Sequence, residues 1–206
     1  MKNILLVLLI ALGLSLCNLS ERFKSGGSTS GPTASGGSSR SVETARATAE
    51  QTAALAGGRE VKWDKQGMSW TIPPNWTEET NESKMFVMRS PGGGNAASLI
   101  VNISPMDESF PTDSSIEATF AQAESRAKNG EVDEVRWVEL DGLKGVQFRE
   151  ANPERPDGPR RLQWMAYRKY TGQVQLVSVM LASDGKDFER HKNAMYGILY
   201  STKIAH

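Results

Sequence analysis

The stretch Arg161–Ala182, RLQWMAYRKYTGQVQLVSVMLA, decides the fold class of this chain. Apolar and polar residues alternate along it with a period of two, which is typical of half-buried β-strands. The alternating positions are Leu162, Trp164 and Ala166 in a first run, and Val174, Leu176, Ser178 and Met180 in a second. Thr171 and Gly172 separate the two runs, so the stretch predicts a pair of antiparallel strands joined by a tight turn.

Further strand patterns precede this pair of strands. They are Met68–Ile72, Lys84–Arg89, Ala97–Ser104, Glu134–Leu140 and Leu143–Glu150. Pro73 and Pro74 end the first of them, because proline cannot donate a backbone hydrogen bond to a sheet. Asp141 and Gly142 join the last two in the manner of a two-residue hairpin turn. The chain therefore predicts an antiparallel sheet of about six to seven strands.

Two helices are predicted, one in the middle of the strand series and one at its end. Ser114 and Glu117 have the spacing of a capping box, which predicts a helix over Ser114–Asn129 with Gly130 as its left-handed cap. The second predicted helix is Lys186–Tyr200. Its apolar stripe is Phe188, Met195, Ile198 and Leu199. Two main helices packed on an antiparallel sheet give the fold class α+β.

The segment Ser69–Trp76, SWTIPPNW, opens this series with a strand, a proline stop and a second tryptophan. Together with the order of elements that follows, it resembles the PsbP-like and DcrB-like α/β/α sandwich group. The resemblance covers about Val61–Ala205 and rests on Trp70, Ile72, Pro73 and Trp76. It implies a small exported lipoprotein or an extrinsic subunit of a photosynthetic complex, acting by binding or assembly without catalysis. No metal or catalytic residue of that group falls on a matching motif in this sequence.

The amino-terminal residues have the pattern of an export signal. Lys2 provides a positive charge, and Ile4–Leu16 is a run of 13 uncharged residues rich in Leu, Ile and Val. This run has the length of a secretory signal and is shorter than the ~20 apolar residues that span a bilayer. The sequence therefore predicts a signal peptide over residues 1–16.

Two readings of the cleavage site remain open. Leu14, Ser15 and Cys17 fit the lipobox of bacterial lipoproteins, in which the cysteine is lipidated, while Leu16 stands where that family normally has Gly, Ala or Ser. Alternatively, an ordinary signal peptidase could use Ser15 and Cys17, or Gly13 and Ser15, and release a soluble protein. The lipoprotein reading is favoured because a flexible, Gly/Ser-rich segment follows Cys17 and would serve as a tether. This reading predicts lipid attachment at Cys17. It places the domain in the cell envelope, anchored to a membrane and facing the periplasm or the outside.

A glycine-rich and serine-rich segment follows the cysteine. Ser25–Arg40 contains 11 Gly or Ser residues among 16, a composition that cannot bury enough surface to fold. Treated as a flexible coil, the 24 residues from Cys17 to Arg40 reach roughly 25 to 30 Å. Ser41–Ala56 is alanine-rich and is interpreted as a marginal helix or an extension of the linker. The predicted organisation is a signal peptide at 1–16, a linker at 17–58 and a folded domain at 59–206.

Charge and cysteine content exclude several classes of function. The formal net charge is zero, and the part from Arg59 onward carries 19 basic and 21 acidic residues. A nucleic-acid-binding domain would show a basic stripe, so nucleic acid is not an expected partner. Cys17 is the only cysteine, so neither an intramolecular disulfide nor a thiolate metal cluster can form. We predict no cofactor and no metal site.

Catalytic chemistry finds little support in the sequence. The two histidines are His191, at the edge of the last apolar stripe and interpreted as structural, and the terminal His206. The leading hypothesis is therefore a non-enzymatic binding or assembly module with a protein partner in the cell envelope. The alternative is a secreted enzyme that uses carboxylates alone. As partner contacts the sequence offers Trp76 and Trp63, because aromatic residues dominate interfaces, and Arg160 from a basic cluster.

Overall fold

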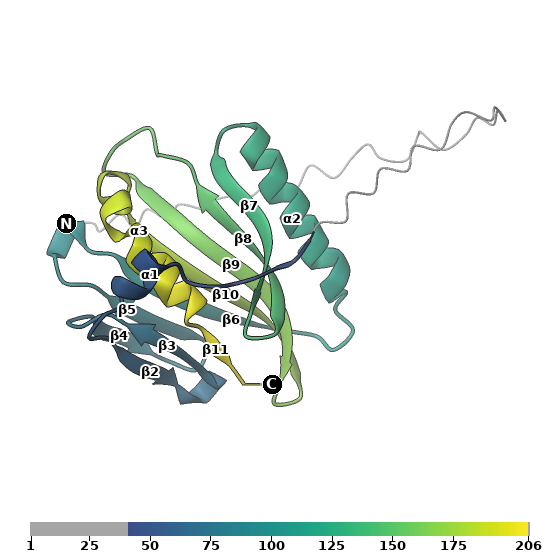
Figure 1. Cartoon of the computed structure of the whole chain (residues 1–206). Helices are drawn as coiled ribbons and strands as arrows, with labels where there is room; N and C mark the ends of the chain where they lie inside the picture. Colours follow the sequence, from purple (N-terminus) through teal and green to yellow (C-terminus); the bar gives the residue numbers. More distant parts are fainter. Residues whose placement is uncertain (1–40, 206) are drawn as a thin grey trace, which may run out of the picture. The chain divides into compact units, whose positions relative to one another are not determined.

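A large sheet forms the centre of the domain. The structure, a computed structural model, describes residues 41–205. Eight strands lie in the order β1-β7-β8-β9-β10-β6-β5-β4 (Figure 1), and all neighbours are antiparallel except β1 and β7. The strands are β1 (Glu43–Thr44), β4 (Thr77–Asn81), β5 (Met85–Arg89), β6 (Ser98–Met106), β7 (Val132–Leu140), β8 (Leu143–Glu150), β9 (Pro159–Tyr170) and β10 (Gln173–Asp184).

Within residues 41–205, a second, small sheet and three helices complete the fold. The small sheet has the order β11-β3-β2. Its strands are β2 (Arg59–Trp63), β3 (Met68–Ile72) and β11 (Lys203–Ile204). The helices are α1 (Ala49–Ala53), α2 (Thr112–Lys128) and α3 (Gly185–Tyr200), with short 3-10 turns at Asp64–Gln66 and Gly93–Asn95. The predicted α+β class is confirmed, with more strands than the six or seven expected.

The two long helices cover opposite faces of the large sheet. Trp137 of β7 stacks on Phe120 of α2 with ring centroids 4.8 Å apart, in a small core of its own. The next residue, Val138, belongs to the main core, which also holds Phe188 of α3 and Trp70 of the small sheet. Successive residues of a strand point to opposite faces. The face that carries Val138 is called the inner face below, and α3 and the small sheet cover it.

The hairpin of β9 and β10 forms as predicted, but one of its faces was assigned wrongly. Trp164 pairs with Val179, and both are fully buried. In β10 the core residues are Val177, Val179 and Leu181, whereas the predicted set from Val174 to Met180 is only half-buried. Both faces of β10 are apolar in sequence, so its alternation is ambiguous. The register set by the turn decides which face enters the core.

The predicted turns are confirmed by their backbone conformation. Asp141 and Gly142 have φ of 47° and 84°, and Thr171 and Gly172 have φ of 48° and 81°. Two successive residues with positive φ match the right-handed twist of the flanking strands. These turns therefore fix β7 to β8 and β9 to β10.

The two predicted helices differ in how well their starts were placed. α3 spans Gly185–Tyr200, and the four residues of its predicted stripe are fully buried. α2 begins at Thr112, two residues before Ser114, and its N-cap Pro111 makes no side-chain hydrogen bond. The predicted capping box at Ser114 and Glu117 is therefore wrong: the start of α2 lies before it. Gly130, with φ of 78°, follows the end of α2 as expected.

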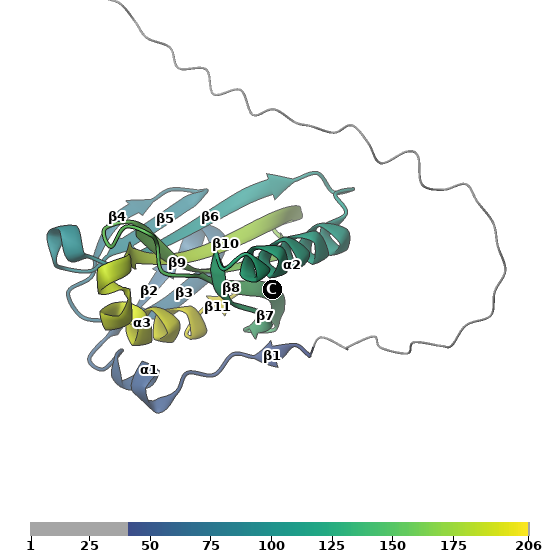
Figure 2. The same ribbon diagram turned by 90° about the horizontal axis from the view of Figure 1, so that it is seen from above.

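The folded unit begins earlier than the predicted boundary at residue 59. Residues 41–56 belong to the same compact unit as the rest of the described chain. We call residues 41–56 the N-terminal arm. In the arm, Thr48 caps α1 in a capping box with Gln51, and α1 lies against the outer side of α3 while β1 lies beside β7 (Figure 2). The alternative of a marginal helix is confirmed for Ala49–Ala53, whereas the interpretation of residues 41–56 as an extension of the linker is wrong, because β1 pairs with β7 and α1 packs on α3.

Candidate functional site: a polar layer between α3 and the sheet

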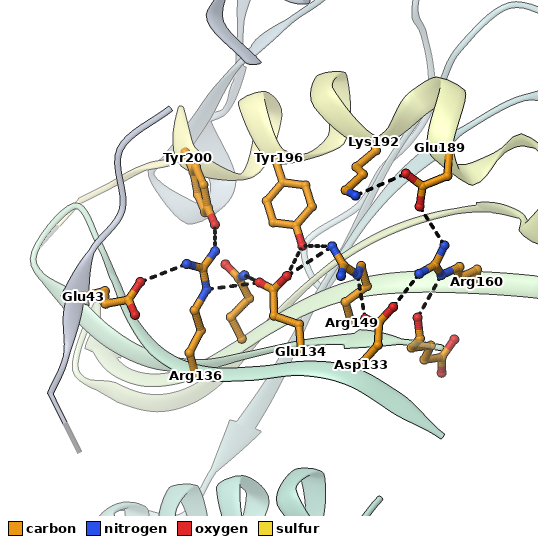
Figure 3. A network of polar contacts seen from close by, with 12 residues as sticks. Glu43, Asp133, Glu134, Arg136, Arg149, Arg160, Glu189, Lys192, Tyr196 and Tyr200 are labelled. Atoms are coloured by element: carbon orange, nitrogen blue, oxygen red, sulfur yellow. Dashed lines mark hydrogen bonds and ion pairs between the residues drawn. The ribbon is translucent and has the colours of Figure 1, made fainter. Parts of the chain in front are cut away.

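A row of charged and aromatic side chains lies between α3 and the inner face of β7, β8 and β9 (Figure 3). We call it the polar layer. Its members are Glu43, Asp133, Glu134, Arg136, Gln147, Arg149, Glu150, Arg160, Glu189, Lys192, Tyr196 and Tyr200. The helix contributes residues spaced by three or four, so all of them lie on one side of α3. Glu134 and Arg136 on β7, like Gln147 and Arg149 on β8, are alternate residues that point to the inner face. An irregularity in the β7–β8 pairing between Val132 and Glu134 lets the neighbouring Asp133 reach Arg149 and Arg160 as well.

The centre of the layer is a triad of Tyr196, Glu134 and Arg149. The hydroxyl of Tyr196 donates to Oε2 of Glu134 at 2.6 Å and accepts from Nη1 of Arg149 at 2.9 Å. Arg149 also contacts Asp133 at 2.7 Å, and Gln147 donates to the other oxygen of Glu134 at 2.6 Å. The Tyr196 hydroxyl, the Glu134 carboxylate and the Arg149 guanidinium therefore each have a partner of complementary polarity.

Arg160 forms the end of the layer near the start of α3. It is 4% exposed, and its guanidinium contacts Asp133 at 2.6 Å, Glu189 at 3.0 Å and the carbonyl oxygen of Glu150 at 2.9 Å. It also lies over the ring of Phe188, 4.3 Å from the ring centre. A buried guanidinium needs such partners, because an unpaired charge in the interior is costly. Arg160 therefore joins β7, β8 and α3.

Arg136 forms the opposite end, where the layer meets the N-terminal arm. Its Nη1 contacts Glu43 of β1 at 2.9 Å, and its Nε makes an ion pair with Glu134 at 3.1 Å. Its Nη2 donates to the hydroxyl of Tyr200. Arg136 and Glu43 are 32% and 56% exposed, so this end is open to solvent.

The environment moves the pKa values of Tyr196 and Arg149 further from neutral pH. Burial and the hydrogen bond to Glu134 raise the pKa of Tyr196. Burial alone would lower the pKa of Arg149, but its contacts with Asp133, Tyr196 and Glu134 outweigh this effect and raise it. The phenol stays protonated and the guanidinium stays charged around pH 7. The arrangement can bind and orient, but these two groups are poorly placed to exchange protons.

The surface pockets of the described part combine opposite charges. A pocket of about 480 Å³ lies at the start of α2, beside Lys144 and Tyr167. Another of about 450 Å³ lies beyond the end of α2, where Arg126 and Arg161 both approach Glu150. Within residues 41–205, no group of three or more His, Asp or Glu side chains is arranged to hold a metal ion. Over the same residues, no helix is long and apolar enough to cross a membrane.

The partner contacts predicted from sequence lie inside the domain. Trp63 is 0% exposed, Trp76 is 6% exposed and Arg160 is 4% exposed. Trp63 donates to the carbonyl oxygen of Glu82 and stacks on Phe86. Their burial contradicts the prediction that these three side chains contact a partner directly. Cys17, the predicted lipid attachment point, lies outside the described residues.

Sequence reasoning missed most of the polar layer. Glu134 and Arg136 alternate on β7, and Tyr196 and Tyr200 lie one turn apart on α3. Charged residues two apart on a strand normally indicate a solvent face, so this pattern alone gave no reason to place them under a helix. Glu43 was missed because it was assigned to the linker.

Comparisons with known proteins concern the fold. No protein-family model matches the chain, and no curated protein matches it. LpqN, involved in cell envelope biogenesis of Mycobacterium tuberculosis, is similar in structure with a TM-score of 0.53 and 11% identity, over 72% of this chain and 86% of LpqN. The cyanobacterial PsbP of Synechocystis sp. PCC 6803 gives a TM-score of 0.47 and 12% identity, over 71% of this chain and 92% of that protein.

A protein of unknown function from Pseudomonas aeruginosa gives a TM-score of 0.45 and 13% identity, over 72% of this chain and 97% of that protein. At such identities a likeness concerns the fold alone. The predicted α+β fold is confirmed, and the chain shares it with LpqN.

Proposed function

We propose that this chain is an exported lipoprotein, lipidated at Cys17, whose α+β domain is a non-catalytic binding or assembly module in the cell envelope. The observation that carries the proposal is the leader, in which the apolar run Ile4–Leu16 directly precedes the only cysteine. A lipid at this point would anchor residues 17–40 as a tether. The tether would hold the domain roughly 25 to 30 Å from the membrane.

Two features of the domain support a module without catalysis. The charged groups of the polar layer are paired with one another, which stabilises the position of α3 on the sheet. Burial and pairing also keep Tyr196 protonated and Arg149 charged near neutral pH. LpqN, which shares the fold, is described as acting in cell envelope biogenesis, and this supports the same compartment for the present chain.

The intact mass of the protein purified from its native host tests the anchor. We expect the mass of a chain that starts at Cys17 and carries acyl groups. A Cys17→Ser variant, which keeps the size of the residue but removes the thiol, should lack the acyl mass. An unmodified chain that starts at Cys17 or Asn18 would contradict the proposal.

A further inference from the structure

The N-terminal arm occupies only part of the free edge of β7. Glu43 and Thr44 pair in parallel with Val138 and Glu139, and the amide of Ala45 donates to the carbonyl oxygen of Glu139 at 3.0 Å. β7 has nine residues. Among residues 41–205, therefore, no strand pairs with most of the length of this edge.

The uncovered part of β7 offers backbone groups for pairing. The carbonyl of Glu139 faces the arm, and alternate residues of a strand direct their backbone groups to the same side. Val135 and Trp137 thus direct their N–H and C=O groups away from β8. In the described part of the chain, no strand pairs with β7 on this side before Val138. An unpaired edge of this kind can accept an extended segment of another chain.

Arg136 gives this edge a charge preference. Its side chain lies on the inner face beside the edge, where it binds Glu43 of the arm at 2.9 Å. Both side chains are partly exposed, at 32% and 56%. If the arm left, Arg136 would lose one carboxylate partner and keep Glu134 and Tyr200. A segment that replaces the arm is therefore favoured when it brings its own carboxylate.

The arm is held weakly compared with the rest of the domain. Neither β1 nor α1 contains a buried residue, and Ala45 and Leu55 are only partly buried where they pack against the core. A cavity of about 130 Å³ lies between arm residues 43–46 and the side chains of Arg136, Val138 and Tyr200. The arm is therefore incompletely packed at this end, and its separation would expose only the part of the core that Ala45 and Leu55 cover.

Gly197 in α3 fits the arm specifically. A Cβ atom added there would lie 2.7 Å from the carbonyl oxygen of Gln51 and 3.0 Å from Cγ of Leu55. Glycine inside a helix costs about 1 kcal/mol relative to alanine. The close approach of α1 accounts for a glycine at this position. The sequence of α3 therefore accommodates the close packing of the arm at this position.

We propose that the free edge of β7, with Arg136 beside it, is a docking site for an extended segment of a partner protein that carries a carboxylate opposite Arg136, adds to β7 as a parallel strand and displaces the arm. The arm itself shows the direction of the strand, the hydrogen-bond pattern and the carboxylate that the site accepts. This inference rests on the proposed function as a binding module and names the surface that the module uses. Because the arm continues into the tether, partner binding would also release the arm from the domain.

The test uses the full chain and a synthetic peptide with the sequence of Ser41–Ala47, SVETARA. The chain carries Gly197→Ala, which loosens its own arm, and is compared with the unsubstituted chain. The peptide can bind only to molecules whose own arm has left β7, so its apparent affinity rises with the fraction of such molecules. We therefore expect the peptide to bind ~10-fold more tightly to the variant. Binding is followed by NMR shifts of the Val135, Trp137 and Glu139 amides.

A charge exchange supplies the matched control. The Arg136→Glu chain should not bind this peptide, but should bind a peptide in which the residue equivalent to Glu43 is Arg. If the Arg136→Glu chain does not fold, Arg136→Gln replaces it and should weaken binding of the original peptide alone. Hydrogen exchange adds a second measurement, in which the Ala45 amide should exchange far faster than amides of β9.

Two results would overturn the proposal. One is an Ala45 amide that exchanges only when the whole domain unfolds. The other is the absence of saturable shifts in the Gly197→Ala chain. Neither measurement depends on a lipid. A failure of peptide binding would therefore not affect the lipoprotein proposal, and a missing acyl group would not affect the docking proposal.

Discussion

The β9–β10 hairpin and the N-terminal arm belong to the same sheet but are held in different ways. The hairpin pairs two strands of 12 residues along their full length, and five alternate residues of each strand are buried. The arm pairs two residues and buries none completely. Pairing in a sheet alone therefore does not determine how much free energy holds a strand in the domain. The burial of apolar surface determines it, since each fully buried large side chain contributes about 1.5 to 3 kcal/mol.

The largest expected effect comes from the hairpin. Trp164 is fully buried, donates to the carbonyl oxygen of Val138 at 3.0 Å and lies against Gly145. Trp164→Ala should lower the free energy of unfolding by about 3 to 5 kcal/mol, because it leaves a large cavity. Leu55→Ala in the arm should cost less than about 1 kcal/mol, because Leu55 is only partly buried. Urea unfolding measures both, and equal losses would refute the comparison.

A smaller effect is expected where the polar layer meets the start of α3. Arg160→Met keeps much of the side-chain volume but leaves Asp133 and Glu189 without their shared partner. Both carboxylates are partly exposed, so we expect a loss of about 2 kcal/mol in chemical denaturation. Arg155→Met, at an exposed ion pair with Asp157, is the control and should change stability by less than about 0.5 kcal/mol. Equal effects would mean that Arg160 does not stabilise α3.

The central triad should add a pH dependence to stability. Burial and the bond to Glu134 raise the pKa of Tyr196 in the folded state above its ordinary value of 10.0. Unfolded molecules therefore release this proton first, so the contribution of Tyr196 is complete below about pH 10 and is lost as the pH rises further. Tyr196→Phe should cost about 1 kcal/mol at pH 7.

The pH profile separates the phenol from other groups. Above pH 10 the free energy of unfolding should fall by up to about 1.4 kcal/mol per pH unit for one such group. The Tyr196→Phe variant should show a smaller slope. Tyr200, whose pKa is also raised by burial, remains in the variant and accounts for the residual slope. Identical slopes for the two proteins would contradict the assignment to Tyr196.

The smallest expected effect belongs to the arm. Glu43→Ala removes an exposed ion pair with Arg136, so the global free energy of unfolding should change by less than about 0.5 kcal/mol. Hydrogen exchange of the Ala45 amide should nevertheless become several-fold faster, because that amide reports only the docking of the arm. A global loss above 1 kcal/mol would show that the arm is part of the cooperative unit and would remove the contrast with the hairpin.

The sequence predictions were correct for features that depend on neighbouring residues and wrong for features that depend on pairing between distant segments. The α3 stripe and the turns at Asp141–Gly142 and Thr171–Gly172 were predicted correctly, because each depends on residues close together in the chain. The core face of β10 was not, because both of its faces are apolar and only the register with β9 distinguishes them. The three-stranded sheet was missed because β11 has two residues and pairs with β3, more than 130 residues earlier.

By itself, the sequence determined the α+β class, the hairpins and the terminal helix, whereas the signal peptide over residues 1–16 and the lipid on Cys17 stay predictions. These features depend on local periodicity, turn residues and composition, and all three involve residues that are close together in the sequence. Tertiary structure alone decided that the arm is part of the fold, that Trp63, Trp76 and Arg160 are buried, and that a polar layer joins α3 to the sheet. Glu43 and Arg136 are 93 residues apart, and no local pattern specifies such a contact, because only the folded sheet brings the two side chains to the same edge.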